Sequence, residues 1–199
     1  MHISLQVLAL LLVALTGCAL QRTAGEQGEV LYRQGQHLAL QGKTAKAEGK
    51  FKESMAYARQ AGFKAGEAHN LNELAILHTS RGECAKARDL LGQALQIYKN
   101  LVMKAEISKS MHNIALTYVR EKRYDPAIAR FSELIEWDRK TGNRLGEAIT
   151  LYNIGILYQK TGRPLEARRV FSQAGVLFEY LGHKRYLRMI PTSAARLED

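Results

Sequence analysis

The sequence contains few residues that interrupt or cross-link a chain. Its 199 residues include only three prolines and two cysteines, while 46% are hydrophobic and 24% are charged. The low proline content leaves room for long helices, and the composition is that of an ordered globular chain. A disulfide within the chain would need both cysteines, and the position of Cys18 favours another use. We therefore expect one elongated domain without a disulfide.

Motifs of common enzyme and metal sites are also missing. The sequence has no His-Glu-x-x-His helix, no Cys-x-x-Cys pair and no Gly-x-Ser-x-Gly turn. Gly42-Lys43-Thr44 is similar to the end of a phosphate-binding loop, but His37 stands where that loop needs its first glycine. We predict a helix–helix turn there, and no catalytic residue, metal or cofactor. His78 and Cys84 are predicted to be packed helix residues, not a ligand and a reactive thiol.

The first 18 residues lack Lys, Arg, Asp and Glu. Val7 to Leu15 is a continuous apolar run, shorter than the about 20 residues that span a bilayer but of the length found in signal peptides. Leu15-Thr16-Gly17-Cys18 resembles the lipobox of bacterial lipoproteins, in which the cysteine is acylated and becomes the new N-terminus. The resemblance implies a signal peptide over 1–17 and lipidation of Cys18. Residues 18–27 are small, polar and without periodicity, which predicts a lipidated tether.

Two alternatives to a lipid anchor stay open, because the start of the chain lacks the usual Lys or Arg. They are an ordinary cleaved signal peptide and a wrongly assigned start without export. In enteric-type bacteria, Asp after the cysteine would indicate retention in the inner membrane, and Ala19 stands there instead. We expect a lipid-anchored protein of the bacterial cell envelope, at the outer membrane and facing the periplasm.

The rest of the chain repeats four times with a period of 40 residues. Matching columns of apolar, small and aromatic residues recur at helical spacing, and glycines punctuate them. Examples are Leu31, Leu71, Met111, Leu151; Gly35, Ala75, Ala115, Gly155; Ala47, Ala87, Ala127, Ala167; and Phe51, Leu91, Phe131, Phe171. Each unit is too small to bury its own apolar face, so neighbouring units must stack.

These columns resemble the tetratricopeptide repeat, in a 40-residue form. The resemblance implies an all-α, right-handed α-solenoid of four helix hairpins plus a C-terminal capping helix. The domain is predicted over 28–187, with repeats at about 28–67, 68–107, 108–147 and 148–187. Predicted helix pairs are 28–41 and 44–60, 66–81 and 84–101, 104–121 and 124–140, and 145–161 and 164–181. Residues 188–199 are predicted as a cap and frayed tail, with Leu187, Met189 and Ile190 packing on the fourth hairpin.

A polar and aromatic stripe on the first helices is the candidate binding surface. Asn113 and Asn153 stand at the same position one repeat apart, and the resemblance implies that such an asparagine holds a peptide backbone, since an amide both donates and accepts. Lys109 and Lys160 would add selectivity for an acidic segment or a C-terminal carboxylate. Alternatively, the asparagines bond only neighbouring helices or water. The predicted groove consists of Tyr32, Arg33, Asn72, Glu73, Lys109, His112, Asn113, Tyr152, Asn153 and Lys160.

The formal net charge of +10 points to anionic partners. Lipid headgroups, lipopolysaccharide phosphates and acidic protein segments fit this charge, whereas export makes nucleic acid an unsuitable partner. We expect a protein–protein interaction scaffold or adaptor, not an enzyme, that binds a segment of another envelope protein in its concave groove. A self-associating structural spacer and a periplasmic enzyme with an atypical site are the alternatives.

Overall fold

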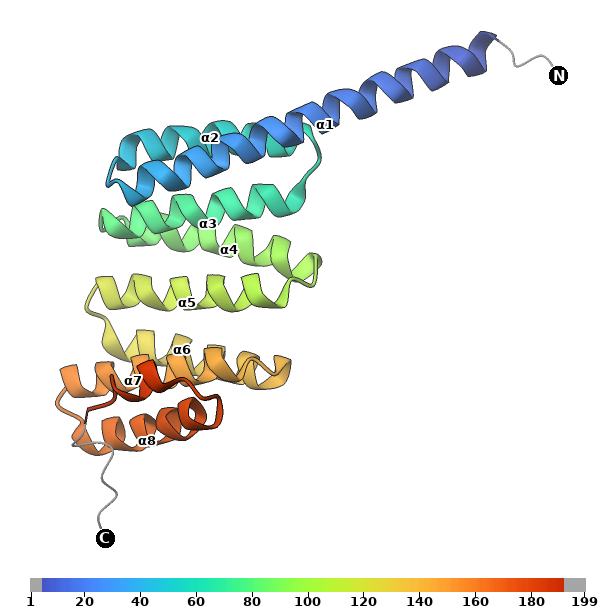
Figure 1. Cartoon of the computed structure of the whole chain (residues 1–199). Coiled ribbons are helices and arrows are strands. Elements are labelled where there is room, and N and C mark those ends of the chain that lie inside the picture. The colour runs from blue at the N-terminus through green and yellow to red at the C-terminus, as the bar shows by residue number, and fades with distance from the viewer. Residues whose placement is uncertain (1–4, 192–199) are drawn as a thin grey trace. The chain divides into compact units, whose positions relative to one another are not determined.

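The computed structural model describes the backbone of residues 5–191 and the side chains of residues 23–191. These residues form nine helices and no strand, and the chain divides into two compact units, 1–101 and 102–199. The helices are α1 (Leu5–Leu40), α2 (Thr44–Gln60), α3 (Lys64–Ser80), α4 (Cys84–Asn100), α5 (Lys104–Arg120), α6 (Tyr124–Thr141), α7 (Arg144–Lys160), α8 (Pro164–Tyr180) and α9 (Lys184–Leu187) (Figure 1). Helices α2 to α8 begin and end within two residues of their predicted bounds, so the repeat register is confirmed.

Unit 1 consists of the hairpins α1/α2 and α3/α4, and α2 packs against α3 (Figure 1). Ala47 and Phe51 of α2 are fully buried, and they share a core with Leu74 and Leu77 of α3. Ala87 of α4 is also fully buried. Small residues at these positions allow close approach of the helices, as the alanine column predicts.

Unit 2 repeats this arrangement with the hairpins α5/α6 and α7/α8, and α6 packs against α7 (Figure 1). Ala127, Phe131 and Phe171 are at most 1% exposed. The ring of Phe171 lies against Gly155 of α7, where a Cβ atom would stand only 2.6 Å from Cε1 of the ring. The glycine is therefore needed for this close contact.

Each helix from α1 to α8 is followed by a turn in which one residue has a left-handed backbone conformation. Gly42, Gly62, Gly82, Gly142, Gly162 and Gly182 all have positive φ, between 68° and 81°. Glycine adopts this conformation without steric cost, and so it ends the helices. At the two turns without a glycine, Val102 and Lys122 take φ values of 56° and 58°. The turn at Gly42-Lys43-Thr44 is thus confirmed as a helix–helix connection.

Helix α1 runs through residues 18–27, where the sequence shows no periodicity and predicts a tether. These residues are helical, and Ala24 is 5% exposed. Ala24, Gly28 and Leu31 are all buried and recur at helical spacing, so the packed part of α1 starts before the predicted residue 28. The first buried positions of α1 are occupied by small residues, so a pattern of large apolar side chains does not indicate them. The side chains of 1–22, including the predicted lipidation site Cys18, lie outside the described residues.

A C-terminal cap packs on α8 as predicted, although one of its contacts differs. The ring of Tyr186 stacks on Phe178, with centroids 4.9 Å apart, and Ile190 is 9% exposed beside Gly175. Met189 was predicted to pack here, but it is 48% exposed. The tail from Ser193 to Asp199 lies outside the described residues. Within the described part of the chain, no helix is both long enough and apolar enough to span a membrane.

Candidate functional site

The predicted groove residues of unit 1 lie on α1 and α3. The Tyr32 hydroxyl donates a hydrogen bond to Glu73 Oε1 (3.2 Å) and accepts one from Gln36 Nε2 (3.2 Å). Its ring lies 5.8 Å from the buried ring of Phe51. Burial, followed by the neighbouring Glu73 carboxylate, raises the pKa of Tyr32. Tyr32 is therefore a neutral, positioned aromatic residue.

Arg33 and Asn72 have different environments. Arg33 is exposed, and its Nε lies 2.8 Å from Glu29 Oε1 on the preceding helical turn. Asn72 is only 2% exposed. It stands in the column of Tyr32, His112 and Tyr152, whose rings pack against a phenylalanine of the paired helix. Unlike these half-buried rings, the side chain of Asn72 is buried, so its assignment to an accessible groove is wrong.

The predicted groove residues of unit 2 lie on α5 and α7 and keep polar groups at the surface. Lys109 and Lys160 are exposed, whereas Asn113 and Asn153 are half-buried. Lys109 precedes Asn113 by four residues and therefore lies on the same face of α5. Lys160 follows Asn153 by two helical turns on α7. Each asparagine thus shares a helix face with a lysine.

Two rings sit beside these asparagines. His112 lies 5.3 Å from the ring of Phe131, and Tyr152 lies 5.5 Å from the ring of Phe171. Burial lowers the pKa of His112, although Asp138 acts in the opposite direction. The His112 imidazole is therefore neutral near pH 7, and the positive charge on this face comes from the lysines.

A buried carboxylate anchors the helices that carry this face. Asp138 of α6 is 1% exposed, and its Oδ1 accepts hydrogen bonds from Ser108 Oγ of α5 (2.6 Å) and Asn143 Nδ2 (2.9 Å). Asn143 Oδ1 in turn accepts from the backbone N–H of Gly146, which caps α7. Burial raises the pKa of Asp138. The network joins α5, α6 and the start of α7.

We predict that Asp138→Asn makes the fold less stable at acid pH, relative to wild type. A carboxyl whose pKa is higher in the folded than in the unfolded protein stabilises the fold below its unfolded pKa and loses this contribution as pH rises through the folded pKa. The amide oxygen of the introduced asparagine still accepts both hydrogen bonds. Urea unfolding should therefore show the variant at least as stable as wild type at pH 7, with its stability relative to wild type falling as the pH is lowered to 3.5.

The control for this experiment is Asp125→Asn, because the Asp125 side chain on the same helix is 82% exposed. In this control, the change in the free energy of unfolding between pH 7 and pH 3.5 should stay close to that of wild type. An Asp138→Asn variant whose relative stability is the same at both pH values would contradict the assigned cost of the buried charge.

His78 and Cys84 are buried helix residues, as predicted. His78 is 3% exposed with its Nδ1 2.9 Å from Glu83 Oε2, and Cys84 is 3% exposed. Among the described residues, no group of three His, Cys, Asp or Glu side chains is placed to hold a metal ion.

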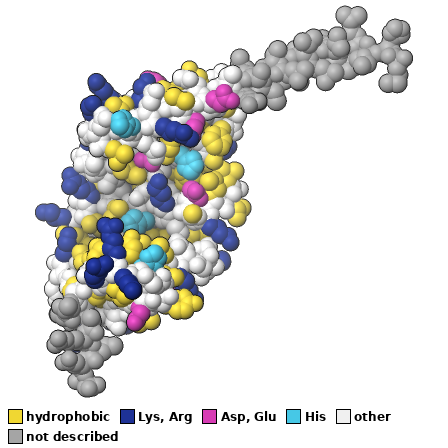
Figure 2. Space-filling model, in the orientation of Figure 1, with side chains coloured by type: hydrophobic (Ala, Val, Ile, Leu, Met, Phe, Trp, Pro, Cys, Tyr) yellow, Lys and Arg dark blue, Asp and Glu magenta, His cyan; other side chains and the backbone are white. Residues whose placement is uncertain are grey.

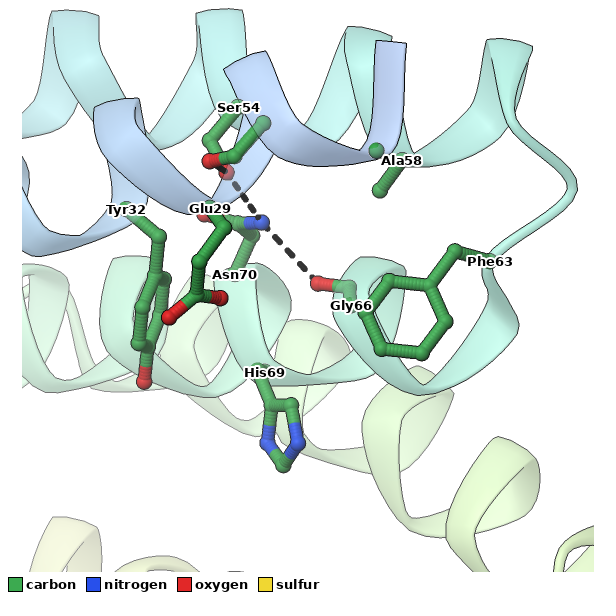
Figure 3. Close-up of a pocket in the computed structure, with 10 residues that line it drawn as sticks. Glu29, Tyr32, Ser54, Ala58, Phe63, Gly66, His69 and Asn70 are labelled. Carbon is green, nitrogen blue, oxygen red and sulfur yellow. Dashed lines mark hydrogen bonds between the residues drawn. The ribbon is translucent and has the colours of Figure 1, made fainter. Parts of the chain in front are cut away.

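The structure adds a pocket in unit 1 that the sequence analysis missed, with a volume of about 150 Å³. Tyr32 and Phe63 lie on opposite sides of its opening, and the side chains of Glu29 and His69 lie between them (Figure 3). Asn70 lies deeper, bonded to Ser54 and Gly66 (Figure 3). The walls come from α1, α2 and α3, and the lining residues are Gly25, Gly28, Glu29, Tyr32, Ser54, Ala58, Phe63, Gly66, His69 and Asn70. Several of these residues are small and form no polar stripe, so the pattern of polar side chains does not indicate the pocket.

The sequence model of the tetratricopeptide repeat family matches residues 26–100 and 106–174, which is most of the chain. The chain belongs to the tetratricopeptide repeat family. Among curated proteins, no sequence matches it. The family membership agrees with the hairpins seen in both units and makes protein–protein interaction the general role of the fold.

Solved structures of similar fold share little sequence with this repeat protein. BtubC from P. vanneervenii is 15% identical with a TM-score of 0.68, over 78% of this chain and 64% of that one. A Rap protein complexed with Competence and Sporulation Factor is 19% identical with a TM-score of 0.63, over 77% and 43%. A Podosopora anserina putative kinesin light chain with TPR-like repeats is 15% identical with a TM-score of 0.63, over 79% and 77%. The chain thus spans less than two thirds of BtubC and less than half of the Rap protein, and these similarities establish the fold.

Proposed function

We propose that this tetratricopeptide repeat protein is a lipid-anchored scaffold of the bacterial cell envelope that binds a segment of another envelope protein. The observation that carries the proposal is the polar face of unit 2, where Asn113 and Asn153 recur at equivalent positions of successive repeats. An amide that both donates and accepts can bond a peptide unit whatever side chain the peptide carries. The partner segment lies along this face.

The chemistry of the face supports an acidic segment as the partner. Lys109 and Lys160 are exposed on the same helix faces as the asparagines, and neutral His112 adds no charge. A carboxylate on the partner would pair with either lysine and fix the orientation of the segment. The Rap protein of similar fold, which is complexed with Competence and Sporulation Factor, is a precedent for a bound factor.

The anchor in this proposal rests on the sequence around Cys18. The apolar run Val7 to Leu15 followed by Leu15-Thr16-Gly17-Cys18 has the order of a lipoprotein signal peptide. Acylation of Cys18 would hold the repeats beside a membrane, and Ala19 favours the outer membrane. In this position the scaffold would meet periplasmic and membrane proteins.

A second basic surface lies at the C-terminal end of unit 2. Lys184 and Arg185 of α9 and the following Arg188 are exposed. Figure 2 shows Lys and Arg side chains gathered beside hydrophobic ones on the part of the visible face where Figure 1 places α9. We call the polar face of unit 2 that carries Asn113 and Asn153 the asparagine face. If the asparagine face makes no partner contact, the basic surface is the next one to test.

Affinity purification from detergent-solubilised membranes tests the proposal. We expect the tagged protein to retain another envelope protein in stoichiometric amount. Retention of its own copies alone would favour a self-associating spacer and would contradict the scaffold. A protein that retains neither partner nor copies would also contradict it and would reopen the question of an enzyme with an atypical site.

A further inference from the structure

The unit 1 pocket lies where an aromatic side chain fills the second and fourth repeats. Ala58, Tyr98, Asp138 and Phe178 occupy the same column, at the last turn of the second helix of each repeat. Tyr98 is 2% exposed, its ring lies 5.5 Å from that of His69, and its hydroxyl is 2.9 Å from His69 Nδ1. Phe178 is fully buried and stacks on Tyr186. In the first repeat the column is reduced to the methyl group of Ala58.

Glycines stand around Ala58, and the ring of Phe63 lies against one of them, Gly66. Gly66 stands in the column of Tyr186, the stacking partner of Phe178, so the first repeat lacks both rings of that pair. Gly25 and Gly28 line the same space from α1, and a Cβ atom on Gly25 would meet nothing within 4 Å. The resulting volume of about 150 Å³ equals that of the engineered apolar cavity known to accept benzene. The pocket therefore has the size of one aromatic ring.

A buried acceptor gives the pocket chemical selectivity. Asn70 is 1% exposed, and its Nδ2 donates to Ser54 Oγ and to the carbonyl of Gly66, both at 2.9 Å. Its Oδ1 is buried and has no hydrogen-bond partner within the described residues. Buried polar atoms are rarely left in this state, so the oxygen points to a donor supplied from outside the chain.

The other polar groups at the pocket also favour a donor. The Tyr32 hydroxyl already donates to Glu73 Oε1, and the Glu29 carboxylate at the opening can only accept while ionised. Glu29 stands in the column of His69, the residue whose Nδ1 meets the Tyr98 hydroxyl in the next repeat. A phenol that entered the pocket in the manner of Tyr98 would bring its hydroxyl toward Glu29, with Asn70 Oδ1 as a second acceptor.

We propose that this pocket binds a tyrosine side chain of the partner segment, in the place that Tyr98 and Phe178 fill from within the chain in later repeats. The proposal rests on the function proposed above, since it assigns one anchor residue of the bound segment. Phe63, 49% exposed at the opening, offers an apolar surface to the entering ring. Buried aromatic anchors of this kind carry a large share of the binding energy at protein interfaces.

Titration of the full-length protein with p-cresol, the side chain of tyrosine as a free molecule, tests this proposal. We expect saturable binding with a dissociation constant on the order of 1 mM or below. NMR shifts should be largest at the Ala58 methyl group and the His69 ring. Toluene, which lacks the hydroxyl donor, should bind several-fold more weakly. No saturable binding of p-cresol, shifts confined to other sites, or equal binding of toluene would overturn the proposal.

The variant Ala58→Tyr supplies a ring from within the chain, as Tyr98 does, and should reduce p-cresol binding about tenfold or more. Ala56→Tyr is the matched control, because Ala56 is exposed on the same helix, and it should bind p-cresol like wild type. Undiminished binding by a folded Ala58→Tyr variant would overturn the proposal. These measurements need no partner protein. Absence of p-cresol binding therefore counts against the pocket alone, whereas failure to retain an envelope partner counts against the scaffold.

Discussion

Replacing Cys18 by serine is expected to abolish the lipid anchor of the protein completely. The hydroxyl of serine is not acylated at a lipobox, and without the modified cysteine the lipoprotein peptidase does not cleave, so the variant keeps residues 1–17. Each buried CH₂ group of an acyl chain contributes about 0.8 kcal/mol, and stable attachment takes more than one chain. Loss of all chains at once therefore abolishes this anchor.

Mass spectrometry and detergent partitioning measure this effect together. Wild type should have the mass of an acylated chain that begins at residue 18, and Cys18→Ser the mass of the unprocessed, unacylated chain. Cys84→Ser is the control, because Cys84 is buried in α4 and plays no part in the anchor. If wild type and Cys18→Ser partition equally and differ in mass only by the substitution, the lipobox interpretation fails.

The double change Asn113→Ala, Asn153→Ala is expected to weaken partner capture roughly ten- to a hundredfold. Two hydrogen bonds to the partner backbone are lost, each with a net contribution of about 0.5–1.5 kcal/mol. Both side chains are half-buried at the surface of unit 2, so the free energy of unfolding should stay within about 1 kcal/mol of wild type. Pull-down of the envelope partner, with unfolding measured in parallel, checks both expectations.

Asn100→Ala is a matched control for this double change. Asn100 is an exposed amide at the end of α4, where it accepts a hydrogen bond from Gln96. The control should capture the partner like wild type. Full capture by a stably folded double variant would place the binding surface elsewhere, and the exposed basic residues Lys184, Arg185 and Arg188 would then be the next to change.

The fold could be predicted from the sequence because its repeats are strictly periodic. The columns of Ala127 and Phe131 locate the close helix contacts, and the glycines locate the left-handed turns, so local signals and packing agree. The start of α1 could not be predicted in this way, because Ala24 and Gly28 bury backbone and methyl groups without a large apolar side chain. Val102 likewise adopts a left-handed turn conformation that its own preferences disfavour.

The candidate site was only partly predictable, since helical periodicity gives the face of a residue but not its depth. Asn72 shares a column with Tyr32 and was assigned to the groove, yet it is buried. The pocket exists because Ala58 stands where Tyr98 and Phe178 place a ring in later repeats. Its polar character depends on the hydrogen bonds that Asn70 makes. Three-dimensional packing was needed to see that these small residues leave space for a ring.

Site-specific photo-crosslinking in intact cells tests the central claim most directly. A photo-reactive amino acid in place of Asn113 reports on the asparagine face, and one in place of the exposed Arg130 of α6 reports on another surface of the same unit. The scaffold account predicts a crosslink from position 113 to a different envelope protein and none from position 130. Crosslinks from position 113 only to other copies of this chain, or a partner crosslink only from position 130, would contradict it.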